Sequence, residues 1–181
     1  MMLSRQSHIN ARGDVAGRDV HKYYEAVRPN PFDAINQRIL DEMAEQPSFN
    51  ETLEILKRHI EPNAHDLRSL EVKLTDAELT QLIIYAKDVK ELFAKKLTEA
   101  QYLKSAQEFY AQLLAKVRMD FNSKIYARIG KIPQEDILEE VTGKIIDPIF
   151  ALLGDNPLSL THEEILGMVY FLTGNCHIDW K

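Results

Sequence analysis

Hydrophobic positions recur at steps of three and four residues over most of the chain after residue 33. This spacing places apolar side chains on one face of an α-helix, where they can pack against a core. The pattern predicts helices over 33–46, 50–60, 64–72, 76–96, 99–129, 134–152 and 161–173.

Helix-start signals support these ranges. A Ser or Thr followed three residues later by Glu or Gln can form a capping box, in which the two side chains satisfy free backbone N–H groups. Four such pairs occur: Ser48 with Glu51, Thr75 with Glu78, Thr98 with Gln101, and Thr161 with Glu164. Gly130, Gly154 and Gly174 suit the opposite ends of helices.

The longest predicted helix carries a wide apolar stripe. Its members are Leu103, Ala106, Tyr110, Leu113, Leu114, Val117, Phe121, Ile125 and Ile129. Together with the preceding helix, this stripe predicts a long antiparallel helical hairpin as the spine of the domain. The spacing is not a sustained heptad, which favours a core over a coiled coil with another chain.

The segment before the first helix has a different character. It reads HINARGDVAGRD from His8 to Asp19, and its two glycines disfavour a helix. Pro29 and Pro31 then enforce extended backbone. We therefore expect an all-α fold, a bundle of six or seven helices over 29–181, with a short β-like arm at 1–28.

The arm contains two near-copies, ARGDV and AGRDV. One copy buries too little apolar surface to be stable alone, so it would stack on identical arms or add to the strand edge of a partner. The alternative is a disordered leader. The candidate interaction residues of the arm are Ile9, Gly13, Asp14, Val15, Gly17, Arg18, Asp19, Val20, Tyr23 and Tyr24.

The C-terminal end is a second candidate interaction surface. A Gly174-Asn175 turn follows the last helix and is compatible with a short final strand. Trp180 either closes the domain's own core or docks on another subunit. The candidate interaction residues here are Cys176, His177, Ile178 and Trp180.

Composition narrows the classes of function. With 45% hydrophobic and 28% charged residues among 181, the chain can bury one ordinary core. The net charge of −6 disfavours nucleic acid as a partner. A basic patch that would support a nucleic-acid-binding alternative is spread around its helix: Lys116, Arg118, Lys124, Arg128 and Lys131.

Candidate chemistry is sparse. The histidines lack the helical spacing of a zinc site, and no phosphate-binding loop of the form GxxxxGK[ST] occurs. The acidic run of Glu135, Asp136, Glu139 and Glu140 is explained by its place near a helix start. We predict no catalytic residues, cofactor or metal, although an enzyme whose carboxylates and histidines converge only in three dimensions stays an alternative.

The cellular compartment follows from the cysteine count and the apolar runs. Cys176 is the only cysteine, which fits a reducing compartment such as the cytoplasm. No apolar run has the length of a membrane-spanning helix, so we expect no membrane association.

Two blocks carry a resemblance to a known family. GDVAGRD in the arm resembles leader motifs of bacterial conflict and antiphage systems. The block from Arg118 to Trp180, with FNSKIYARI and IIDPIFALLGDNPLSLTHEEILGMVYFLTGNCHIDW, resembles the C-terminal helical module of ABC three-component systems.

The resemblance implies a non-catalytic connector that joins an effector to a middle component and an SMC-like ATPase. We expect these subunits as partners, and a homo-oligomer formed through the arm. The chain departs from the family because residues 1–181 leave no room for an effector domain before the module. It is then either a stand-alone subunit that recruits effectors in trans, as Met1-Met2 favours, or a fragment.

Overall fold

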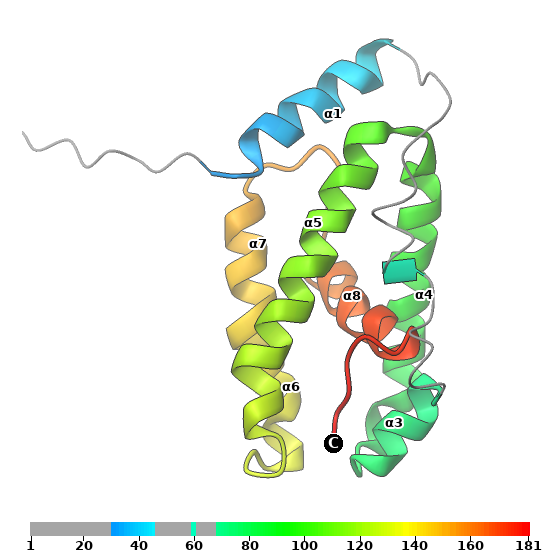
Figure 1. Cartoon of the computed structure of the whole chain (residues 1–181), viewed down its shortest axis with the longest axis vertical. Coiled ribbons are helices and arrows are strands. Elements are labelled where there is room, and N and C mark those ends of the chain that lie inside the picture. The colour runs from blue at the N-terminus through cyan, green and yellow to red at the C-terminus, as the bar shows by residue number, and fades with distance from the viewer. Residues whose placement is uncertain (1–29, 46–58, 61–67) are drawn as a thin grey trace, which may run out of the picture.

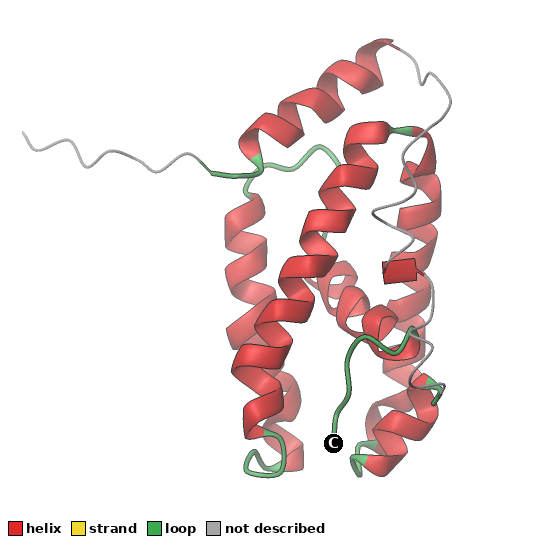
Figure 2. Cartoon of the chain, viewed as in Figure 1, coloured by secondary structure: helices red, strands yellow, loops and turns green. Residues whose placement is uncertain are grey.

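Helices make up nearly all of the regular structure in residues 30–45, 59–60 and 68–181, the ranges that the computed structural model describes. The α-helices there are α1 (Asp33–Glu45), α3 (Leu70–Asp76), α4 (Ile83–Glu99), α5 (Lys104–Asp120), α6 (Ile137–Val141), α7 (Asp147–Leu153) and α8 (His162–Gly174). No strand occurs in these ranges, at the C-terminal end or elsewhere (Figure 2). The predicted all-α class is confirmed.

Two long helices each contain a π-helical turn. α5 continues through the π-turn η3 (Phe121–Ile125) into the short 3-10 helix η4 (Tyr126–Arg128). α6 continues through the π-turn η6 (Thr142–Ile146) directly into α7. The predicted helices 99–129 and 134–152 therefore exist, but neither is a uniform α-helix.

The helix α8 occupies the centre of the bundle. Figure 1 shows it crossing between α4 on one side and α5 and α7 on the other. All its residues from Glu164 to Thr173 are buried, as expected for a segment that is apolar on every side. Its start has the predicted capping box: Thr161 accepts from the Glu164 N–H, and the Glu164 carboxylate accepts from the Thr161 N–H.

The hairpin of α4 and α5 is present, but α4 packs mainly against α8, which crosses between the two helices (Figure 1). α4 meets α5 through the rings of Phe93 and Tyr110, whose centroids are 5.8 Å apart. It approaches α8 much more closely, because a Cβ on Gly167 would lie 2.2 Å from the Val89 carbonyl oxygen. The absence of a side chain at Gly167 thus permits this crossing.

α1 covers one end of α5. Phe32, just before α1, packs edge to face against Phe109, with ring centroids 5.2 Å apart. The Glu42 carboxylate accepts a hydrogen bond from the Ser105 N–H at 3.0 Å, which satisfies a free donor at the start of α5. A side chain of α1 thus caps the start of α5, where the N-cap residue of α5 itself makes no side-chain hydrogen bond.

Several predicted helix boundaries are wrong. Thr98 does not start a helix, because its hydroxyl donates to the Ala94 carbonyl inside α4, and α5 begins only after Leu103. Thr75 lies within α3, and Glu78 adopts a positive φ of 60° in the following turn. The predicted helix 76–96 consequently starts late, with a 3-10 turn at Thr80–Leu82.

Other predictions fall partly or wholly outside the described ranges. These are the Ser48 capping box, most of the helix 50–60, and the first part of the helix 64–72. The arm at 1–28 and its candidate residues also lie outside the described part of the chain. α3 itself begins at Leu70, where Ser69 caps the helix by accepting from the Val72 N–H.

Candidate functional site

The C-terminal segment folds back between α3 and η4 (Figure 1). The buried Lys73 ammonium donates to the Ile178 carbonyl at 3.0 Å, and Arg68 pairs with Asp179 at 2.5 Å. On the other side, the Tyr126 hydroxyl donates to the Lys181 carbonyl at 3.3 Å. The segment is therefore held to the body from both sides.

Trp180 closes the domain's own core, which is one of the two alternatives left open by the sequence. Its side chain is 1% exposed, and its ring contacts Phe121 and Tyr170 at centroid distances of 4.8 and 5.9 Å. Cys176 and Ile178 are also buried, and His177 is half-buried. Contact between these residues and a partner stays a prediction. At the buried Cys176, Ile178 and Trp180 it would require the segment to leave this position.

A periodicity of four residues explains the two π-turns. Buried residues at this interval are Val117, Phe121 and Ile125 in the first helix, and Ile137, Val141, Ile145, Ile149 and Leu153 in the second. An α-helix turns by about 100° per residue, so each four-residue step overshoots a full turn by about 40°. A π-turn takes more residues per turn and brings the later side chains back to the core face.

Pro148 adds a local cause for the second π-turn. Proline has no N–H to donate to the Lys144 carbonyl four residues before it, and its ring crowds that carbonyl. The Lys144 carbonyl instead accepts a hydrogen bond from the Lys124 ammonium at 3.2 Å. Lys124 belongs to η3 and Lys144 to η6, so this bond joins the two π-turns.

We call the surface of η3, η4, α6 and η6 the paired π-turn face. Asp120, 2% exposed, accepts from Lys116 at 2.6 Å and Lys124 at 3.0 Å. On the α6 side, Glu140 pairs with Arg128 at 2.6 Å and lies 3.7 Å from Lys144. Charges of both signs therefore cross-link the two helices.

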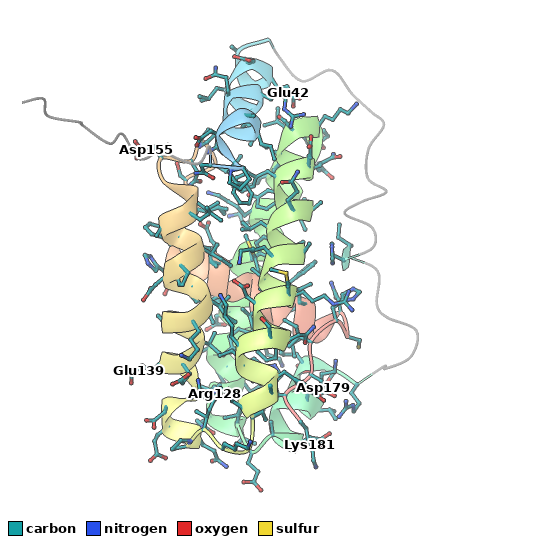
Figure 3. The ribbon with its side chains drawn as sticks, turned by 60° about the vertical axis from the view of Figure 1, so that its left-hand side comes forward. Glu42, Arg128, Glu139, Asp155, Asp179 and Lys181 are labelled. Carbon is teal, nitrogen blue, oxygen red and sulfur yellow. The ribbon has the colours of Figure 1, made fainter. Side chains whose placement is uncertain are left out.

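Two shallow cavities of opposite charge open on this face. The basic cavity, of about 450 Å³, is lined by Ser123, Lys124, Arg128, Lys144 and Pro148. The acidic cavity, of about 440 Å³, is lined by Asp136, Glu139, Glu140, Gly143 and Lys144. Lys144 belongs to both, so the cavities are neighbours. Figure 3 labels Arg128, which lines the basic cavity, and Glu139, which lines the acidic cavity.

The structure separates the basic patch considered in the sequence. Lys116 and Lys124 are paired with Asp120, and Arg128 is paired with Glu140. Carboxylates thus interrupt the positive charge that a phosphate backbone would need. The acidic run at 135–140, explained above by a helix start, supplies part of this interruption.

The largest perturbations of tyrosine ionisation lie in the core. Burial raises the pKa of Tyr110, and the nearby Glu164 and Glu99 raise it further. Burial likewise raises the pKa of Tyr170, with a smaller effect from Tyr85. Both rings belong to the aromatic cluster around α8, so these shifts report packing and do not mark a reactive centre.

Within the described ranges, none of the helices combines the length and apolar content that crossing a membrane requires.

Comparison with known proteins places the folded unit in a family context. Residues 69–180 match the family model of C-terminal domain 9 of the ABC-three component (ABC-3C) systems. The match begins at Ser69, the N-cap of α3, and ends at Trp180, which closes the core. It thus contains both π-turns and the C-terminal segment. No curated protein and no solved structure matches the chain.

Proposed function

The chain belongs to the family of C-terminal domain 9 of ABC-3C systems, and from this premise we propose that it is a non-catalytic assembly subunit of a bacterial antiphage defence complex. It acts in the cytoplasm and links an effector to the middle component and the SMC-like ATPase through protein contacts. The observation that carries this proposal is the family match over residues 69–180.

The interior of the matched unit supports a role in binding rather than catalysis. The centre, where α8 crosses the bundle, is filled by side chains such as Tyr170 and Trp180. The grouped charged side chains of the paired π-turn face lie on the outer surface and are about two-fifths exposed at Lys124 and Lys144. A well-packed core with charges on its surface suits docking of other subunits.

Reconstitution tests this function directly. The full chain is co-expressed with the effector, the middle component and the ATPase of its own system. Complexes are purified, and their molar masses are measured by light scattering. The expected result is a complex in which this chain bridges two of the other components. If each component is folded and still fails to bind the chain, the proposal is wrong.

The arm at 1–28 contributes self-association in this proposal. Deleting residues 1–28 should lower the oligomeric mass and leave the helical domain 29–181 folded. A full-length chain that is already a monomer in dilute solution contradicts this part of the proposal without affecting the linking role.

A further inference from the structure

On the paired π-turn face, the ion pairs within the chain do not neutralise all of the charged side chains. The basic cavity has three cations, Lys124, Arg128 and Lys144. Their carboxylate partners are Asp120, which is almost fully buried and shared with Lys116, and Glu140, which Arg128 and Lys144 share. The cavity therefore keeps a surplus of positive charge at its surface.

The neighbouring cavity has the opposite surplus. Asp136 and Glu139 are exposed and line it together with Glu140. Lys144, the only cation among the lining residues of this cavity, stands at the boundary with the basic one. Positive charge is therefore in excess on one side of Lys144 and negative charge on the other. The two helices that carry these charges are held together by hydrogen bonds and ion pairs.

The π-turns fix this pattern in place. Pro148 leaves the Lys144 carbonyl without the usual helical N–H donor, and the Lys124 ammonium donates to it. This bond aligns η3 with η6 and so positions the residues that line both cavities. Such preorganised charges lose little freedom when a partner binds, which favours their use in recognition.

The pattern favours a protein partner over a nucleic acid. A phosphate backbone is uniformly negative and would be repelled by Asp136, Glu139 and Glu140 beside the basic cavity. A protein segment can present a carboxylate and a cation on one side and so match both surpluses.

We propose that the paired π-turn face binds a segment of another subunit of the same system that places a carboxylate in the basic cavity and a Lys or Arg side chain in the acidic cavity. This inference rests on the proposed function and specifies the surface by which the chain is bound. It also predicts that binding weakens as salt concentration rises, because both contacts are ionic.

The experiment compares two variants, one in each cavity. Glu139→Lys reverses an exposed charge of the acidic cavity, and Lys144→Gln removes the cation shared by both cavities. Matched controls on α4 are Glu91→Lys and Lys95→Gln, which change exposed charges of the same types away from this face. Affinity for the purified middle component, ATPase and effector is measured by calorimetry, and thermal unfolding verifies that each variant is folded.

The expected result is a loss of affinity of about tenfold in Glu139→Lys and Lys144→Gln for one of the three subunits, with the controls unchanged. If the wild-type chain binds a subunit and both cavity variants bind it equally well, this inference is overturned while the proposed function stands. If the wild-type chain binds none of the three, both fail together.

A short DNA duplex at low salt serves as the last probe. If the chain binds DNA, and Lys144→Gln weakens this binding while Glu139→Lys strengthens it, the inference is overturned, because the face would then recognise phosphate. No change in DNA association between the wild-type chain and either cavity variant supports it.

Discussion

The indole N–H of Trp180 donates a hydrogen bond to the Thr173 hydroxyl oxygen at 3.0 Å, and both side chains are buried. The Thr173 hydroxyl in turn donates to the Val169 carbonyl at 2.8 Å. Trp180 is therefore attached to the central helix α8 by a polar contact as well as by its ring contacts. The C-terminal segment is part of the core.

Replacing Trp180 should destabilise the domain strongly. Trp180→Ala leaves a large cavity beside Phe121 and Tyr170 and should lower the free energy of unfolding by about 3–5 kcal/mol. Trp180→Phe keeps much of the ring packing and loses the indole hydrogen bond, so its cost should be clearly smaller. Urea unfolding of both variants measures the difference. Equal stability of Trp180→Ala and the wild-type chain would contradict the core assignment.

Gly167 should tolerate no side chain. Gly167→Ala places a methyl group against the Val89 carbonyl oxygen and the Phe93 Cβ, at 2.2 and 2.9 Å before relaxation, so α4 and α8 must separate. We expect a loss of about 1–3 kcal/mol in thermal or chemical unfolding. The matched control is Gly143→Ala, where a Cβ meets nothing within 4 Å. It should be neutral or stabilising by up to about 1 kcal/mol.

Deleting one residue from a π-turn should be tolerated far better than deleting one from a regular α-helix. Without Gly143, the buried residues Val141 and Ile145 become three positions apart, which suits an α-helix. Deleting the exposed Ala115 from α5 instead rotates all following core residues by about 100°. Circular dichroism and thermal unfolding should show a folded Gly143 deletion and a severely destabilised Ala115 deletion. Similar damage from both would refute the register argument.

The ion pair of Glu71 and Lys87 should make stability depend on pH in the acid range. The hydrogen bond from Lys87, at 2.6 Å, is the largest cause that lowers the pKa of Glu71 from its ordinary value of 4.5 to about 2. A lowered pKa stabilises the folded state above pH 4.5, and this stabilisation is lost as the pH falls from 4.5 towards 2. The contribution should stay below about 1 kcal/mol because both side chains are substantially exposed.

Comparing the unfolding of the wild-type chain and Glu71→Gln across this pH range isolates the effect. The difference in stability should be largest at neutral pH, shrink below pH 4.5, and shrink also at high salt. A difference that persists unchanged near pH 2 would show that Glu71 acts through something other than its charge.

Local sequence signals predicted the parts of the fold that local interactions determine. The capping box of Thr161 and Glu164 and the fully apolar run after it located α8 correctly. The same signal failed at Thr98, which lies inside α4 and donates to the Ala94 carbonyl. The start of α5 is capped instead by Glu42 of α1, far away in sequence. A capping motif is therefore misleading where the preceding helix continues through it, as α4 does at Thr98.

The π-turns have a signal in the sequence, although the apolar spacing alone predicts an ordinary helix there. Apolar residues at unbroken four-residue intervals, as from Ile137 to Leu153, exceed the α-helical period and indicate inserted residues. The proline at 148 inside a predicted helix was a second indication.

The charge pattern of the paired π-turn face could not be read from the sequence. Lys124 and Lys144 are 20 positions apart, and Arg128 and Glu140 are 12 apart. Their proximity depends on how the hairpin between them closes and on the register of both π-turns. The sequence pattern places the basic residues and the acidic run on two separate helices, and only the tertiary contacts bring them together.

The position of Trp180 also bears on how the domain is made in the cell. Its ring contacts Phe121 of η3 and Tyr170 of α8, which are synthesised earlier, so the core stays incomplete until Trp180 has left the ribosome. Helices can form during synthesis, but the packed state around α8 cannot be completed before Trp180 is available to fill its place. Before that point the nascent chain exposes apolar surface, and chaperones have their opportunity to bind it.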